Sequence, residues 1–117
     1  MDERDRRLFG ILIDHATVAL AYAHRRGRDW WQNNETLDAI LMRVSQVGEV
    51  ATRISPEGLT EVRGVTWRDV KGMRSRIVHD YEEIDMTIIR GVVSRQLPAL
   101  VRSVRRALND DDKRRDR

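Results

Sequence analysis

The segment from residue 37 to residue 54 constrains the fold most, because its apolar side chains recur every three or four positions along its whole length. They form one stripe, made of Leu37, Ile40, Leu41, Val44, Val47, Ala51 and Ile54. A stripe with this period is typical of an amphipathic helix that packs one face on a core. The Ser55-Pro56 pair that follows is typical of a helix end. The sequence therefore predicts a helix here.

Two further segments before residue 82 have the same period. Residues 8–22 predict a first helix, with Asp2 as a possible N-cap and Gly27 as the stop after two arginines. A third helix opens near Thr66, where Thr66-Trp67-Arg68-Asp69 resembles a capping box, and runs through Tyr81. Residues 28–33 read as a connector, and residues 56–65 read as a loop without periodicity.

The last third predicts a helix that is not continuous. Asp85 can cap it, and its apolar stripe runs from Ile88 to Leu108. Pro98 falls inside the stripe and should kink or split the helix, because proline lacks the N–H that the helix needs. The sequence thus predicts an all-α fold, an antiparallel four- to five-helix bundle. We expect a single domain over residues 1–109 and a polar, disordered tail over residues 110–117.

Composition excludes several classes of protein. The chain has no cysteine, which excludes disulfides and thiolate metal sites. No apolar run approaches the length of about 20 residues that a membrane span requires, and the N-terminus lacks the apolar centre of a signal peptide. We therefore expect a cytoplasmic protein without membrane contact. A net charge of +3 is only mildly basic, and the strong preference for arginine over lysine suits phosphate recognition or reflects codon usage.

The stretch GMRSRIVHDY, residues 72–81, gathers four reactive side chains on the third predicted helix: Arg74, Ser75, His79 and Tyr81. With Arg74 at zero on a helical wheel, Tyr81 lies about 20° away, whereas His79 lies about 140° away. An ideal helix thus does not bring Arg74 and His79 together. Either the helix distorts there, or a second subunit completes the site.

These side chains suit phosphodiester cleavage without a metal. An imidazole can move a proton to or from a ribose or leaving oxygen near neutral pH, and a guanidinium can stabilise charge on the phosphorus. One histidine without an acidic cluster falls short of a metal site, so we expect no metal and no cofactor. The spacing alone also fits a helix that carries an interior histidine by chance.

The flanking residues add a family resemblance. QVGEVATRISPE at residues 46–57, VTWRDVKGMRSRIVHDYEEID around the motif and QLPALVRSVRRAL near the end resemble the HepT-like toxins of the HEPN superfamily. The match carries the Gly-Glu pair of the second helix, the tryptophan that opens the third, R-x4-H-x-Y and the Leu-Pro pair. It covers nearly the whole chain.

The resemblance implies a specific function. Members of this group are all-helical homodimers that cleave RNA without metal at a cleft between subunits, which would make Arg74 and His79 catalytic. Tyr81 matches the tyrosine that receives AMP from a nucleotidyltransferase antitoxin, which blocks the toxin. Ser75 stands where the family commonly has asparagine, and it can still support His79 by a hydrogen bond from one turn away. We therefore expect the endoribonuclease of a type VII toxin–antitoxin pair. The alternatives are a non-catalytic subunit that presents RNA or another substrate to a nucleotidyltransferase, and a purely structural subunit.

Overall fold

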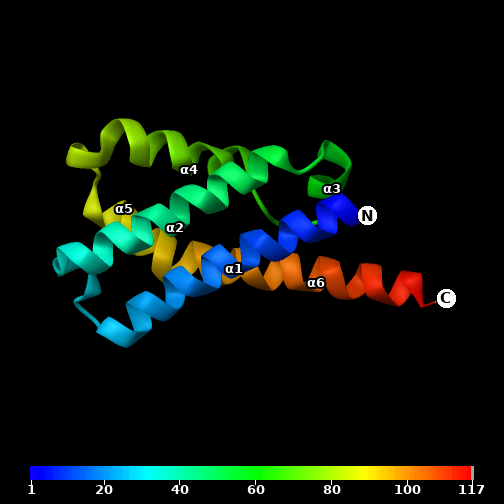
Figure 1. The fold of residues 1–117 in the computed structure, drawn as a ribbon, viewed down its shortest axis with the longest axis horizontal. Helices are drawn as coiled ribbons and strands as arrows, with labels where there is room; N and C mark the ends of the chain where they lie inside the picture. Colours follow the sequence, from blue (N-terminus) through cyan, green and yellow to red (C-terminus); the bar gives the residue numbers. More distant parts are fainter. Residues whose placement is uncertain (117) are drawn as a thin grey trace.

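The computed structural model of the chain describes residues 1–116. Four long helices dominate these residues: α1 (Glu3–Arg26), α2 (Asn34–Arg53), α4 (Trp67–Asp80) and α6 (Leu97–Arg115). α1 and α2 form an antiparallel pair, with α4 packed along α2 and α6 along α1 (Figure 1). Within the described residues there is no β-strand. The predicted all-α bundle is confirmed.

A polar side chain caps the N-terminus of each of the first two long helices. The Asp2 side chain accepts a hydrogen bond from the backbone nitrogen of Asp5 at 2.7 Å, which confirms it as the N-cap of α1. Gly27 ends α1 at a φ of +101°, a conformation that glycine adopts without steric cost. The connector at residues 28–33 contains a short 3-10 turn, Trp30–Gln32, and Asn33 then caps α2.

The loop predicted for residues 56–65 is partly wrong, because the short helix α3 (Pro56–Thr60) occupies its first half. Ser55 caps this helix by accepting a hydrogen bond from the Gly58 nitrogen, and Pro56 occupies its first turn. The buried carboxylate of Asp5 accepts hydrogen bonds from the nitrogen and hydroxyl of Ser55. This long-range anchor, which local periodicity does not show, fixes α3 against α1.

The predicted capping box at the start of α4 is also wrong in its contacts. The helix does begin at Trp67, directly after Thr66. The Thr66 side chain, however, makes no capping hydrogen bond with any residue up to 116. Trp67 instead holds this end of the helix, since its indole nitrogen donates to the carbonyl of Leu59 at 3.0 Å and its ring packs against Phe9.

The last predicted helix, expected to be kinked or split at Pro98, is interrupted by a π-helical segment just before this proline. Asp85 caps the short helix α5 (Met86–Gly91), a π-helical segment follows at Val92–Gln96, and α6 begins at Leu97 with Pro98 in its first turn (Figure 1). The Leu97 nitrogen donates to the carbonyl of Val92, five residues back. The wider π turn accommodates a residue that cannot donate a backbone hydrogen bond.

The expected disordered tail is not observed, because α6 continues to Arg115. Asp111 is buried and accepts a hydrogen bond from Arg6 at 2.6 Å, while Asp112 binds the same guanidinium. These partners lie more than 100 residues away in sequence, so a polar run that looks unpartnered is tied to α1. Arg117, the end of the predicted tail, lies outside the described residues.

The apolar stripes of the long helices meet in one core. Phe9, Leu12, Ile40, Val47 and Val104 are completely buried in it. None of the described helices is both long enough and apolar enough to cross a membrane.

Candidate active site on helix α4

The motif R-x4-H-x-Y lies along the second half of α4 and just beyond its end. Val70 and Ile77 are buried and fix which face of α4 points to the core. Arg74, Ser75 and His79 lie within the α-helix, whereas Tyr81 begins a 3-10 turn, Tyr81–Glu83. The segment Trp67–Asp80 is α-helical without interruption, so no distortion of the helix brings the motif residues together.

Gly48 sets the distance between α2 and the motif helix. A Cβ atom at this position would lie 2.9 Å from the carbonyl oxygen of Val70 and 3.1 Å from the backbone nitrogen of Arg74. Only glycine allows so close an approach of the two helices without a shift of backbone. The Gly-Glu pair of α2 therefore has a structural role beside the motif arginine.

Glu49, the next residue, is the partner of Arg74. Its carboxylate oxygen Oε2 lies 3.2 Å from the Nε of Arg74. The Arg74 side chain is 53% exposed and that of Glu49 is 38% exposed, so water screens the pair and its contribution to stability is about 0–1 kcal/mol. The ion pair orients the guanidinium while leaving it accessible.

Ser75 and His79 lie on the outer face of α4. Both are exposed, and neither makes a side-chain hydrogen bond or ion pair with a residue in the range 1–116. On the regular helix the directions of Arg74 and His79 differ by about 140°. A single chain therefore displays both side chains to solvent without directing them at one reacting atom.

Tyr81 contacts α2 at the opposite end from Glu49. Its phenol donates a hydrogen bond to Oδ1 of Asp38, and the pKa of Tyr81 is raised mainly by this hydrogen bond. Met42 lies one turn after Asp38 on α2, and Val78 lies one turn after Arg74 on α4. Both of these apolar side chains are more than half exposed. We call the surface formed by Asp38, Met42, Glu49, Arg74, Val78 and Tyr81 the motif face.

The sequence profile described as "Ribonuclease HepT-like" matches residues 12–107, most of the chain and all of the motif. The chain belongs to the HepT-like ribonuclease family. This confirms the resemblance that the sequence motifs indicate. A protein of Caldanaerobacter subterraneus subsp. tengcongensis named "Putative RNase TTE0752" is 23% identical over 73 residues, which cover 62% of this chain and 65% of the relative. No solved structure matches the chain.

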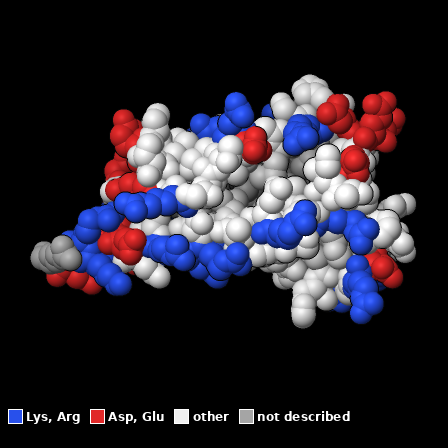
Figure 2. Space-filling view, turned by 180° about the vertical axis from the view of Figure 1, so that it is seen from behind, with Lys and Arg blue, Asp and Glu red and all other residues white. Residues whose placement is uncertain are grey.

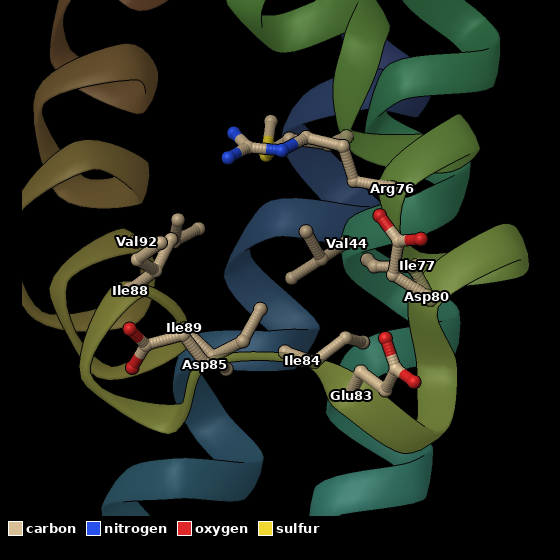
Figure 3. Close-up of a pocket in the computed structure, with 11 residues that line it drawn as sticks. Val44, Arg76, Ile77, Asp80, Glu83, Ile84, Asp85, Ile88, Ile89 and Val92 are labelled. Atoms are coloured by element: carbon tan, nitrogen blue, oxygen red, sulfur yellow. The ribbon is translucent and has the colours of Figure 1, made fainter.

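A cavity of about 360 Å³ lies between α4 and α5 (Figure 3). Apolar side chains such as Val44, Ile77 and Ile88 form its walls. Four charged side chains stand at its rim: Arg76, Asp80, Glu83 and Asp85. None of the four motif residues lines it. Nor do three or more histidine, cysteine or acidic side chains within residues 1–116 gather where they could hold a metal ion.

The structure locates the four predicted residues but adds two that sequence reasoning missed. Asp38 and Glu49 each contact a motif residue across the α2–α4 interface. The sequence did point to Glu49, since it belongs to the Gly-Glu pair of the family resemblance. Nothing in the sequence pointed to Asp38, because 43 positions separate it from Tyr81 and only the packing of the helices brings the two together.

Proposed function

We propose that this chain is the toxin of a type VII toxin–antitoxin pair, a metal-independent endoribonuclease that acts in the cytoplasm as a homodimer. The observation that carries the proposal is the complete R-x4-H-x-Y motif, exposed on α4 and the turn that follows it in a chain from a ribonuclease family. The length of the match and its agreement with the fold make a chance motif a poor explanation.

In the proposed reaction the ribose 2′-hydroxyl attacks the adjacent phosphorus and the bond to the 5′ oxygen breaks. His79 takes the hydroxyl proton or gives one to the leaving oxygen, and Arg74 stabilises the negative charge on the phosphoryl oxygens. The products are a 2′,3′-cyclic phosphate and a free 5′-hydroxyl. Ser75, which lies one turn before His79 and makes no side-chain hydrogen bond with a described residue, would support the imidazole when RNA is bound.

A second copy of the chain would complete this site. Arg74 and His79 point about 140° apart on a regular helix, so a phosphate that meets both needs side chains from two copies. Met42 and Val78 expose apolar surface beside Arg74, as side chains do at an interface between subunits. These two observations support the homodimer.

The charge distribution supports an RNA substrate. α6 displays Arg102, Arg105 and Arg106 on its exposed side, and Figure 2 shows basic side chains in rows over this part of the molecule. Arginine pairs well with phosphate groups, and a basic row can follow the backbone of a single strand. We infer that α6 contributes to binding of the RNA outside the cleavage site.

Tyr81 is the proposed site of control by a nucleotidyltransferase antitoxin. Its side chain is half exposed, and like Arg74 it contacts α2, through Asp38 where Arg74 contacts Glu49. Transfer of AMP to the phenol would add a phosphate that pairs with Arg74 and an adenosine that fills the approach to it. Such a modification would block RNA from the site.

A non-catalytic role stays a second candidate because of Ser75. Serine is shorter than the asparagine common at this position and cannot supply an amide, so His79 has a weaker support. In that case the same bundle would bind RNA, or present a substrate, to a partner nucleotidyltransferase without cleaving anything itself.

The test is cleavage of a labelled single-stranded RNA by the purified protein in the presence of a chelator. The ribonuclease account predicts fragments that end in a 2′,3′-cyclic phosphate, with cleavage lost in Arg74→Ala and His79→Ala. Intact RNA from a well-folded wild-type protein would favour the binding subunit. Cleavage that the chelator abolishes would refute metal independence.

A further inference from the structure

The hydrogen bond between Tyr81 and Asp38 places a carboxylate on the phenol that is the proposed site of modification. The phenol donates to Oδ1 of Asp38, which extends from the second turn of α2. Both residues are exposed, Tyr81 to 50%. The contact is thus accessible to a partner protein, and the hydroxyl proton of Tyr81 already points at an acceptor.

We propose that Asp38 is the proton acceptor for nucleotidyl transfer to Tyr81. The oxygen of Tyr81 attacks the α-phosphorus of a nucleoside triphosphate held by the partner nucleotidyltransferase. The bond between the α-phosphorus and the α–β bridging oxygen breaks, pyrophosphate leaves, and the phenolic proton passes to the carboxylate of Asp38. This inference rests on the proposed modification of Tyr81 and assigns a role to a residue outside the R-x4-H-x-Y motif.

The chemistry requires such an acceptor. The hydrogen bond to Asp38, with a smaller effect of desolvation, raises the pKa of Tyr81, so the phenol keeps its proton near neutral pH. As the new bond to phosphorus forms, the phenolic oxygen loses electron density and becomes far more acidic. A carboxylate already in hydrogen-bond contact then receives the proton without rearrangement. Protein kinases use an aspartate in the same way on the hydroxyl of their substrates.

No other described group has the position for this role. Within residues 1–116, Asp38 is the one side chain that bonds the phenol. His79 lies two residues before Tyr81 and points to the other side of α4. Asp80 and Glu82 flank Tyr81 in the chain, and Glu35 lies on the preceding turn of α2; none of these carboxylates bonds the phenol among the described residues. Asp38 thus supplies from the toxin a group that the partner enzyme would otherwise have to provide.

The experiment measures AMP transfer to the full chain by its cognate nucleotidyltransferase with saturating ATP, followed by intact mass and peptide mapping. Asp38→Asn keeps the size of the side chain and an acceptor oxygen but cannot take the proton. Glu35→Gln is the matched control, because it removes one exposed carboxylate from the same helix without touching Tyr81. Tyr81→Phe identifies the labelled residue, and circular dichroism checks that each variant folds.

We expect Asp38→Asn to slow the transfer about 100-fold at pH 7, whereas Glu35→Gln leaves the rate unchanged. The pH profile separates proton transfer from mere positioning. The wild-type rate stays flat from pH 7 to 9, because transfer of the proton to a side chain in contact with the phenol does not depend on hydroxide in solution. The Asp38→Asn rate rises about tenfold per pH unit, because the variant depends on phenolate formed in solution.

Each contrary result has a distinct meaning. If Tyr81 is labelled and Asp38→Asn is labelled at the wild-type rate, or slowly with a flat pH profile, Asp38 is not the proton acceptor. If the wild type takes no label, or Tyr81→Phe takes as much, the proposed modification itself is wrong and the inference falls with it.

Discussion

Gly48 of α2 packs so closely on Arg74 of α4 that a Cβ atom at Gly48 would lie only 3.1 Å from the backbone nitrogen of Arg74. This close approach of α2 and α4 fixes the position of the motif arginine relative to Glu49, its ion-pair partner. It also explains in physical terms why a glycine stands in the middle of a long helix, where it costs about 1 kcal/mol relative to alanine.

Gly48→Ala should therefore destabilise the protein in spite of the better helix propensity of alanine. The new methyl group would meet backbone atoms of α4, which cannot move aside as a flexible side chain can. We expect a net loss of about 1–2 kcal/mol in the free energy of unfolding, measured by denaturant titration. Gly10→Ala is the control, since nothing lies within 4 Å of its Cβ position in α1 and the change should stabilise the protein slightly. Equal effects of both substitutions would contradict the packing argument.

The divergence of Arg74 and His79 on α4 predicts that inactive variants complement each other. In a dimer that combines Arg74 of one copy with His79 of the other, an Arg74→Ala chain and a His79→Ala chain together form one intact site. After the two variants are unfolded and refolded as a mixture, about half of the dimers are mixed, and ribonuclease activity should return to about a quarter of the wild-type value. Either variant refolded alone serves as the control. Mixed dimers that form without any activity would show that each site uses residues of one copy.

Asp111 predicts a dependence of stability on pH. Burial alone would raise the pKa of this carboxyl, but hydrogen bonds from Arg6, the Met1 ammonium and Arg115 outweigh burial and hold the pKa well below its usual range. The native state thus favours the ionised form. The resulting stabilisation is fully present above about pH 4, the ordinary pKa of aspartate, and is lost as the pH falls below it.

Asp111→Asn should cost about 2 kcal/mol of stability at pH 7, because Arg6 and Arg115 lose the carboxylate that they share and keep only Asp112 and Glu3. The loss should shrink as the pH falls below 4, where the wild type also loses this stabilisation. Thermal unfolding at several pH values measures both effects. Asp110→Asn, a change at the exposed neighbouring position, should do little. A loss that stays constant from pH 7 to 2 would show that the charge of Asp111 is not what stabilises the fold.

The long helices could be predicted from the sequence because their signals are local. Apolar period, Asp2 as a cap and Gly27 as a stop all act within a few residues, and so does the effect of Pro98. The errors have long-range causes. α6 extends through a polar run because Asp111 reaches Arg6, and α3 is fixed because Asp5 reaches Ser55.

The candidate site likewise combines features that local sequence predicts with contacts that depend on the packing of distant segments. The motif itself can be read from one short stretch, and so can the angle of about 140° between Arg74 and His79. The two carboxylates that contact the motif cannot be predicted from this stretch. Asp38 contacts Tyr81, and Glu49 contacts Arg74, only because α2 packs on α4.

Inducible expression in a bacterial host, with growth and total RNA integrity followed together, tests most directly whether His79 is part of a ribonuclease site. The wild type is compared with His79→Ala and with His24→Ala, a matched change at an exposed histidine near the end of α1, away from the motif. The account predicts growth arrest and RNA fragments from the wild type and from His24→Ala, and neither from His79→Ala. Arrest and fragmentation that persist in His79→Ala at equal expression would contradict it.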